Sequence, residues 1–186
     1  MGRLQDKIAL VTGAGTGLGG QIARRFHEEG ARLIINDINN EAAQSLAAEV
    51  DGTVILADVS DSVAVAAMFS KVAEDFGRLD ILVNNAGFAF ANDEGDVIAR
   101  MNEVPFKQMA EMQATGVVET HMDHTVNMSD ESWHRMIGVH LNGTFFCSRE
   151  ALKIMNPQLS GCIINMGSIM GSTGGVGTSY CAAKAG

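Results

Sequence analysis

A tyrosine and a lysine near the end of the chain have the spacing needed for proton transfer. Tyr180 and Lys184 are four positions apart, so in a helix their side chains lie on one face. A free tyrosine has a pKa of about 10, which is too high for a good proton shuttle at neutral pH. A neighbouring ammonium group favours the phenolate and lowers that pKa. The pair predicts a tyrosine acid–base, although the same pattern also describes an ordinary helix with an exposed lysine.

A glycine-rich turn near the N-terminus is the second chemical feature. The apolar run Ile8–Val11 is typical of a buried parallel strand, and residues 12–19 read Thr-Gly-Ala-Gly-Thr-Gly-Leu-Gly. Leu18, Ile22 and Phe26 then recur at helical spacing, so a helix is expected to begin at the turn. Backbone N–H groups and the positive end of a helix dipole bind pyrophosphate in such a unit. The sequence therefore predicts a dinucleotide site, where glycines permit close approach of the backbone.

An acidic residue follows the next expected strand, Arg32–Asn36. Asp37 lies 18 residues after Gly19, where a carboxylate can hydrogen-bond an adenosine ribose. A carboxylate there would repel a 2′-phosphate, and the next residues, Ile-Asn-Asn, offer no positive charge. We therefore expect NAD as the cofactor rather than NADP. The alternative is that Asp37 caps the following helix, a role that either of the two asparagines can also fill.

Strands and helices alternate along the rest of the chain. Ser129 is expected to cap a helix that has Asp130 and Glu131 in its first turn. The alternation predicts an α/β fold with a doubly wound parallel sheet in a three-layer α/β/α arrangement. Further strands are expected at Thr53–Ala57, Ile81–Val83 and Cys162–Met166, and further helices at 65–76 and from 133 to about 155.

The motifs and their order resemble the short-chain dehydrogenases/reductases of the FabG-like kind. The match spans nearly the whole chain and implies a Rossmann fold. The family's motifs stand at Thr12–Gly19 for Thr-Gly-x3-Gly-x-Gly, Asp58–Val59 for Asp-Val, Asn84–Gly87 for Asn-Asn-Ala-Gly, and Ser168, Tyr180 and Lys184 for the catalytic serine, tyrosine and lysine.

The resemblance implies reversible hydride transfer between nicotinamide C4 and the carbon of a secondary alcohol or ketone, such as a 3-oxoacyl, steroid or cyclic substrate. Ser168 would orient the substrate oxygen, Tyr180 would move the proton, and Lys184 would lower the pKa of Tyr180 and bind the nicotinamide ribose. The implied cofactor-binding residues are Gly13, Thr16, Gly17, Leu18 and Gly19 at the pyrophosphate, Asp37 with Ile38 at the adenosine ribose, Asp58 and Val59 at the adenine, and Asn85, Ala86 and Gly87 along the floor, besides Tyr180 and Lys184.

Two details near the implied catalytic residues depart from the family. His140 stands where the family usually has an asparagine that helps to hold a water next to the lysine. A histidine also donates and accepts hydrogen bonds and titrates near neutrality, so His140 either serves this relay or only packs. The spacing from Ser168 to Tyr180 is one residue shorter than expected. The glycine-rich segment 171–179 is expected to absorb the difference as a flexible loop, with Ser172 and Ser179 as alternatives to Ser168.

The segment 88–128 is longer than the family needs. It carries several methionines, which suit an adaptable apolar surface, and Pro105 is expected as the first residue of a helix. We expect a surface excursion folded onto the domain, with a lid or a subunit contact near the substrate as the alternative. His121, Asp123 and His124 are interpreted as solvated loop residues, because nothing else completes a metal shell. No metal site is expected.

Composition excludes several classes of function. The chain has 186 residues, 46% of them hydrophobic, and 21 glycines, which suits one globular α/β domain. A net charge of −9 with no basic cluster argues against binding to nucleic acid or to an anionic membrane surface. The sequence has no apolar run of transmembrane length and no signal-peptide pattern. Its three cysteines lack metal-ligand spacing and are expected to be reduced in a cytoplasmic protein.

Family members continue beyond the helix that contains Tyr180. We expect residues 1–186 to be a single NAD-binding domain that lacks the last strands, poorly soluble and inactive alone, and the complete protein to be a homodimer or homotetramer. The first hypothesis is an enzyme of which these residues are an incomplete sequence. The alternatives are an inactive NAD-binding module and an interaction protein that uses segment 88–128. The presence of Ser168, Tyr180 and Lys184 together favours the enzyme.

Overall fold

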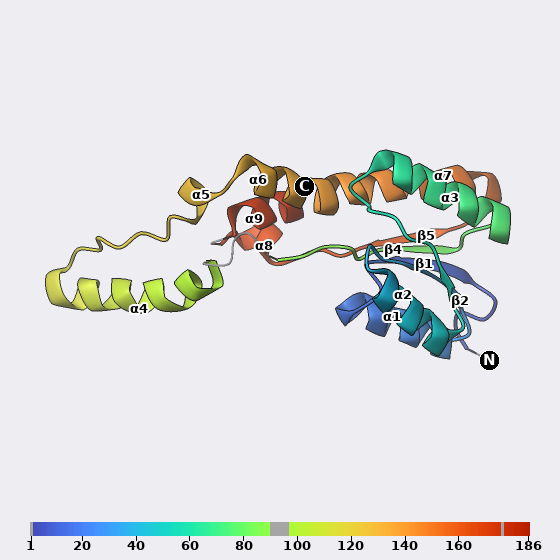
Figure 1. The fold of residues 1–186 in the computed structure, drawn as a ribbon, viewed down its shortest axis with the longest axis horizontal. Coiled ribbons are helices and arrows are strands. Elements are labelled where there is room, and N and C mark those ends of the chain that lie inside the picture. Colours follow the sequence, from blue (N-terminus) through green and yellow to red (C-terminus); the bar gives the residue numbers. More distant parts are fainter. Residues whose placement is uncertain (1, 90–96, 176) are drawn as a thin grey trace. The chain divides into compact units, whose positions relative to one another are not determined.

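A computed structural model describes residues 2–89, 97–175 and 177–186 (Figure 1). The chain forms two compact units. Unit 1 comprises Met1–Gly87 and Gly138–Gly167, and unit 2 comprises Phe88–Ile137 and Ser168–Gly186. Residues 90–96 of the segment expected to be an insertion, and residue 176 of the expected glycine-rich loop, lie outside the described residues. The expectation of a single domain stays a prediction.

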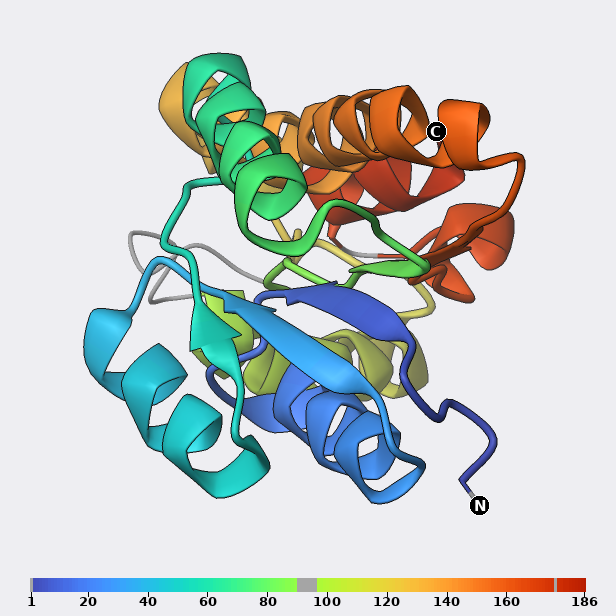
Figure 2. The same cartoon turned by 90° about the vertical axis from the view of Figure 1, so that its right-hand side faces the viewer.

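Unit 1 is built on a parallel five-stranded sheet in the order β3-β2-β1-β4-β5. Helices α1 and α2 cover one face, and α3 and α7 cover the other (Figures 1 and 2). This arrangement confirms the predicted doubly wound α/β fold. The strands are β1 (Ile8–Thr12), β2 (Arg32–Asn36), β3 (Thr53–Val54), β4 (Ile81–Asn84) and β5 (Cys162–Asn165), and the helices are α1 (Gly17–Glu28), α2 (Asn40–Val50), α3 (Ser62–Phe76) and α7 (Gly143–Gln158).

Both faces of the central strands are buried. In β1, Ile8 and Leu10 join the apolar cluster under α3 and α7, whereas Ala9 and Val11 join the cluster under α1 and α2. Successive side chains of a strand point to opposite faces, so a strand covered on both sides must be apolar throughout. This is why the short continuous apolar runs of the sequence predicted the strands. At the edge of the described sheet, by contrast, Cys162 and Ile164 of β5 are exposed.

Two expected elements of the sequence analysis differ in the structure. The third strand is only Thr53–Val54 rather than Thr53–Ala57. Beyond it the N–H of Ile55 donates once more to the carbonyl of Ile35 at 3.0 Å, and the side-chain amide of Asn36 donates to the carbonyls of Ile55 and Ala57, at 3.1 Å each. The helix expected from 133 to about 155 is instead divided into α6 (Asp130–Ile137), a π-helical turn η2 (Gly138–Asn142) and α7, which ends at Gln158.

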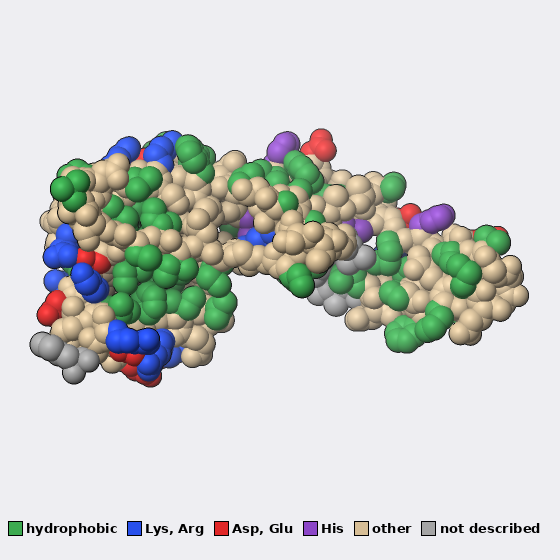
Figure 3. Space-filling view, turned by 180° about the vertical axis from the view of Figure 1, so that it is seen from behind, with side chains coloured by type: hydrophobic (Ala, Val, Ile, Leu, Met, Phe, Trp, Pro, Cys, Tyr) green, Lys and Arg blue, Asp and Glu red, His purple; other side chains and the backbone are tan. Residues whose placement is uncertain are grey.

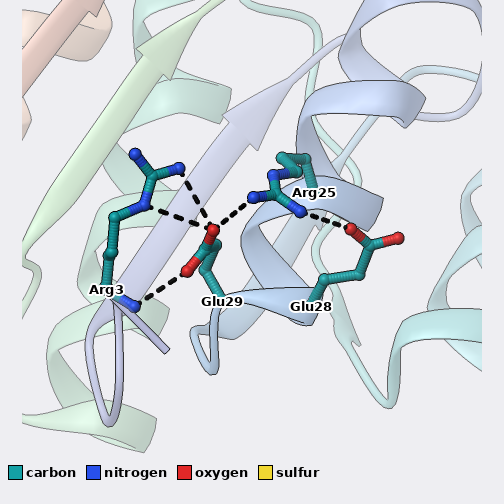
Figure 4. Close-up of polar contacts among 4 residues, drawn as sticks. All are labelled: Arg3, Arg25, Glu28 and Glu29. Atoms are coloured by element: carbon teal, nitrogen blue, oxygen red, sulfur yellow. Dashed lines mark hydrogen bonds and ion pairs between the residues drawn. The ribbon is translucent and has the colours of Figure 1, made fainter. Parts of the chain in front are cut away.

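The surface of unit 1 carries a cluster of ion pairs where α1 ends (Figure 4). The Glu29 carboxylate accepts from the main-chain N–H of Arg3 at 2.8 Å and from the Arg3 guanidinium, and it also pairs with Arg25. Arg25 bonds Glu28 as well, at 2.8 Å. Hydrogen bonds from Arg3 hold the pKa of Glu29 below its usual value. This cluster fastens the segment before β1 to the end of α1.

Unit 2 consists of helices joined by extended segments. Its helices are α4 (Val97–Thr115), α5 (His124–Asn127), α6, α8 (Met170–Thr173) and α9 (Thr178–Ala185), and α9 packs against α6 and α8. The Ser129 hydroxyl accepts from the N–H of Ser132 at 3.1 Å, which confirms the predicted cap. The start of the expected flexible loop 171–179 is wrong, because residues up to Thr173 belong to α8.

Helix α4 begins well before Pro105, so the expectation of a proline-initiated helix is wrong. The flanking residues, rich in Met, Glu, Lys, Gln and Ala, favour a helix strongly enough to continue through the proline. Side chains of α4 fasten the segment that follows it: the Glu111 carboxylate accepts from the N–H of Thr120 at 3.0 Å, and Arg100 pairs with Asp123 at 3.0 Å.

Much of α4 is open to solvent. Hydrophobic side chains gather at the surface in the region of α4 (Figure 3), where Phe106, Met109 and Met112 are exposed. Among the described residues no helix is long and apolar enough to cross a membrane, and no group of three His, Cys, Asp or Glu side chains could hold a metal ion. Whether segment 88–128 is a surface excursion or a lid stays a prediction.

Candidate functional site

The glycine loop of unit 1 has the local geometry that the sequence predicts. It follows β1 directly, and a helix begins within it, as expected; the first residue of α1 is Gly17. Gly13 and Gly17 have φ angles of 59° and 58°, in the left-handed region that favours glycine. A Cβ atom on Gly13 would lie 2.7 Å from the Cα atom of Ala86. The loop therefore packs tightly against the residues after β4 and tolerates no side chain at Gly13.

The first turn of α1 is open to an anion. Thr16 is the N-cap residue, but its side chain makes no capping hydrogen bond, and no acidic residue lies in the first turn. A Cβ atom on Gly17 would meet nothing within 4 Å, and Leu18 is exposed. N–H groups at a helix start that lack internal acceptors bind phosphate groups well. The residues present thus fit the pyrophosphate of a dinucleotide.

The side chains of Thr12, the last residue of β1, and of Asn85, which follows β4, hold the beginning of this loop in place. The Thr12 hydroxyl accepts from the N–H groups of Asn85 and Ala86, at 3.1 Å each, and donates to the carbonyl of Val83. The side-chain amide of Asn85 donates to the carbonyls of Thr12 and Gly13, at 2.9 and 3.0 Å. Asn85 thus supports the loop, and its expected place on the cofactor floor with Ala86 and Gly87 stays a prediction. Sequence reasoning missed the role of Thr12, although its place directly before Gly13 was a signal.

Asp37 lies beside the loop at the end of β2. Its carboxylate accepts from the N–H of Gly15 and from the N–H of Asn39, at 2.9 Å each. The N-cap of α2 is Asn39, whose side chain accepts from the N–H of Ala42 at 3.1 Å. The alternative interpretation of Asp37 as the helix cap is therefore wrong. The predicted contact of Asp37 with a ribose stays a prediction, as does that of the exposed Ile38.

Asp58 and Val59, expected beside the adenine, follow the short third strand. The Asp58 carboxylate accepts from the N–H and the hydroxyl of Ser60, at 2.8 and 2.7 Å. Val59 is buried and packs on α7, where a Cβ atom on Gly143 would lie 2.9 Å from its Cγ2 atom. Asp58 thus shapes the turn, and Val59 belongs to the core. Their contact with adenine stays a prediction.

His140 lies in the π-helical turn η2 and is buried. A Cβ atom on Gly87 would lie 2.3 Å from the Cε1 atom of His140, so the imidazole lies directly against the backbone of Gly87. The hydroxyl of Thr144 donates to the carbonyl of His140 at 2.7 Å. π-Helical turns often occur at functional sites. The structure thus brings His140 to the Asn-Asn-Ala-Gly motif within unit 1, and its relay role stays a prediction.

The three implied catalytic residues all belong to unit 2. The hydroxyl oxygen of Ser168 accepts from the N–H of Met170 at 3.2 Å, at the start of α8. In α9, the Nζ atom of Lys184 lies 5.8 Å from the centroid of the Tyr180 ring. The two side chains therefore share one face of the helix, as their spacing predicts. Burial lowers the pKa of the half-buried Lys184.

A glycine that sequence reasoning missed brings α8 close to α9. A Cβ atom on Gly171 would lie 2.4 Å from the carbonyl oxygen of Lys184. Any larger residue would push the helix that follows Ser168 away from the last turn of α9. Because a small residue at a close backbone contact leaves no periodic pattern, the sequence offered only the glycine itself as a signal.

Comparison with known proteins agrees with these features. The profile of the short chain dehydrogenase family matches residues 7–128 and 119–186. Meso-2,3-butanediol dehydrogenase of Serratia marcescens is 37% identical over 186 residues, covering 98% of this chain and 61% of the relative. The 2-dehydro-3-deoxy-L-rhamnonate dehydrogenase (NAD(+)) of a Sphingomonas strain is 35% identical over 187 residues, covering 100% and 63%. The 3-oxoacyl-[acyl-carrier-protein] reductase FabG of Haemophilus influenzae is 33% identical over 186 residues, covering 98% and 64%. The chain thus spans less than two thirds of each relative.

Proposed function

The chain belongs to the short chain dehydrogenase family, and on this basis we propose that the complete protein is an NAD-dependent oxidoreductase. It transfers a hydride between nicotinamide and the carbon of a secondary alcohol or ketone. The observation that carries the proposal is the Tyr180–Lys184 pair on one face of α9, in a chain whose glycine loop opens onto an uncapped helix start.

Unit 1 supplies the binding groups for the cofactor. The N–H groups of the glycine loop and of the first turn of α1 hold the pyrophosphate, and the Asp37 carboxylate accepts from the adenosine ribose. His140, held against Gly87, keeps the motif after β4 in place and is available as a relay for protons. The loop residues in these roles are Gly13, Thr16, Gly17, Leu18 and Gly19, with Ile38, Asp58, Val59, Asn85, Ala86 and Gly87 around them.

Unit 2 supplies the proton chemistry. The Ser168 oxygen already accepts from the N–H of Met170, so its own hydrogen is free to bind the substrate oxygen. The Tyr180 hydroxyl gives a proton to that oxygen in reduction and takes it back in oxidation. The Lys184 ammonium, on the same face of α9 as Tyr180, binds the nicotinamide ribose. When bound, the nicotinamide gives or accepts the hydride.

Acidic residues favour NAD over NADP. Asp37 would repel a 2′-phosphate. In a nearby cavity of about 360 Å³ beside Gly15 and Thr16, Glu41 adds a negative charge, while the Arg24 guanidinium that also lines it is paired with Glu49 at 2.8 Å. The name of the Sphingomonas relative also carries NAD(+). Titration of the complete protein with NADH and NADPH tests this proposal. We expect tighter binding of NADH than of NADPH. Asp37→Ala should weaken the binding of NADH and reduce the difference in affinity between the two cofactors. Equal or tighter binding of NADPH would refute it.

The relatives' names point to small alcohols and ketones as the substrate class: a 2,3-diol, a deoxy sugar acid and a 3-oxoacyl group. Each carries a secondary alcohol or ketone, which is the group that the Ser168–Tyr180 chemistry requires. A panel of such compounds, with cyclic alcohols and steroids added, identifies the substrate. With the best one, Tyr180→Phe should abolish turnover while cofactor binding stays within about twofold, because only the proton-carrying oxygen is lost. Substantial residual turnover would show that another acid moves the proton.

A second candidate function is an interaction module, which the exposed Phe106, Met109 and Met112 of α4 favour. The two candidates differ in the substrate panel, since an interaction module turns over none of its members. If the complete protein is an enzyme, we propose that it acts in the cytoplasm as a homodimer or homotetramer. Sedimentation of the complete protein tests the assembly state.

A further inference from the structure

We propose that Asp37 is a positioning residue of the glycine loop in addition to binding the ribose. Its loss should then weaken dinucleotides even when their adenosine ribose offers no hydroxyl group to it. The inference rests on the proposed cofactor function, but its structural half concerns only the contacts of unit 1 in the cofactor-free protein.

The carboxylate of Asp37 joins two separate turns. One oxygen accepts from the N–H of Gly15, in the loop after β1, and the other accepts from the N–H of Asn39, in the turn after β2. Both distances are 2.9 Å. Hydrogen bonds from N–H groups to an ionised carboxylate are about twice as strong as neutral ones. Asp37 therefore ties the middle of the glycine loop to the start of α2.

The loop and the carboxylate are packed as closely as a glycine allows. A Cβ atom on Gly15 would lie 2.9 Å from an oxygen of Asp37 and 2.9 Å from the Cβ atom of Ala42. The need for glycine at this position thus arises from the approach of Asp37 and α2. The approach to Asp37 concerns the same oxygen that accepts the Gly15 hydrogen bond, and the contact with Ala42 adds α2 as a second neighbour of Gly15.

Other anchors hold the two ends of the loop. At its beginning, the N–H of Ala14 donates to the carbonyl of Asn36, and Asn85 holds the carbonyls of Thr12 and Gly13. From Gly17 onward the chain is helical. Between these ends, Gly15 and Thr16 border the cavity of about 360 Å³ next to α2. Because this side of the loop faces a cavity, the bond from Gly15 to Asp37 fixes its middle.

The two roles of Asp37 do not compete for the same lone pairs. A carboxylate has about four acceptor positions, and the N–H groups of Gly15 and Asn39 use two of them. Two positions remain for ribose hydroxyls. Binding of the ribose thus leaves the loop anchor intact, and one side chain can couple the choice of cofactor to the shape of the pyrophosphate site.

The decisive probe is a nicotinamide dinucleotide whose adenosine ribose lacks the 2′- and 3′-hydroxyls. Its affinity for the complete protein, measured by isothermal titration calorimetry, reports the pyrophosphate loop without the ribose contact. We expect Asp37→Ala to weaken this analogue about tenfold, and Asp37→Asn, which keeps one acceptor for Gly15, to stay within about threefold of the unchanged protein. Hydrogen exchange of the Gly15 amide without cofactor should accelerate in Asp37→Ala and stay slow in Asp37→Asn.

Asn39→Ala is the matched control, because it removes the cap of α2 and leaves the Gly15 bond in place. It should change neither the analogue affinity nor the Gly15 exchange. The proposal is overturned if Asp37→Ala leaves both measurements unchanged while it weakens NADH, or if Asn39→Ala reproduces both effects. If the unchanged protein binds neither NADH nor NADPH, the proposed function fails, and the exchange of Gly15 still decides the positioning role.

Discussion

The sheet of unit 1 and helix α4 of unit 2 use apolar residues in opposite ways. Leu82 of β4 is fully buried, and α1, α2, α3 and α7 cover both faces of the central strands. In α4, Val104 is buried while Phe106, Met109 and Met112 are exposed. The same type of residue is therefore a stability determinant in one region and free surface in the other. Apolar content alone does not tell these two cases apart.

The sharpest way to break this comparison is to truncate one side chain in each region. Leu82→Ala should lower the free energy of unfolding by about 2–5 kcal/mol, because it leaves a cavity in a covered sheet. Met109→Ala on α4 should change it by less than about 0.5 kcal/mol. Urea unfolding followed by circular dichroism measures both. Equal effects would show that α4 is covered in solution, which would favour the interaction module.

A second test concerns Asp80, a buried charged residue directly before β4, within the apolar region of the sheet. The Asp80 carboxylate is buried, accepts from the N–H of Ile8 at 2.9 Å, and pairs with Lys7 and Arg78. Burial raises its pKa, but the bonds from Arg78 and Ile8 outweigh this and hold the pKa below its usual value. Asp80→Asn should lower the free energy of unfolding by about 1–3 kcal/mol at pH 7, as measured by urea unfolding.

The pH dependence of that cost follows from the sign of the pKa shift. The contribution of Asp80 is fully present above the pKa of the unfolded state and is lost as the pH falls through the lower folded pKa. The difference in the free energy of unfolding between the unchanged protein and Asp80→Asn should therefore become smaller in acid. A difference that stays constant from pH 7 to pH 3 would contradict the assignment.

Within unit 2, the contact between α8 and α9 should be sensitive where α4 is tolerant. Gly171→Ala places a methyl group against the carbonyl of Lys184 and should destabilise the packing of these helices by about 1–3 kcal/mol. Gly167→Ala is the matched control, because a Cβ atom there meets nothing within 4 Å. Turnover with the identified substrate should fall for the first variant more than for the second. A similar loss of turnover in both variants would show that activity does not depend on the contact between Gly171 and Lys184.

The smallest effect is expected at the surface cluster of Glu29. Bonds from Arg3 lower its pKa, so its contribution is present above the unfolded pKa and is lost as the pH falls through the folded pKa. Glu29→Gln should lower the melting temperature slightly at pH 7 and not at pH 3. Exposed ion pairs contribute little, so added salt should reduce even this difference. If Glu29→Gln lowers the melting temperature equally at both pH values, the substitution acts on packing rather than on charge.

Local patterns in the sequence were sufficient for most of the fold. Continuous apolar runs predicted β1, β2 and β4, because strands covered on both faces leave no polar alternation, and they also predicted β5, which is exposed at the edge of the described sheet. The glycine loop and a helix that begins at this loop followed from motif and helical spacing, and so did the common face of Tyr180 and Lys184. Each of these features depends on residues within a few positions of one another, and the sequence displays such relations directly.

Contacts between distant residues needed the tertiary structure. The sequence placed Asp37 at the end of a strand but could not show that its carboxylate holds Gly15, 22 positions away. It could not show that His140 lies against Gly87 or that Gly171 meets Lys184. These features depend on which segments approach each other and how closely, and a pattern with a fixed local period carries no record of that distance.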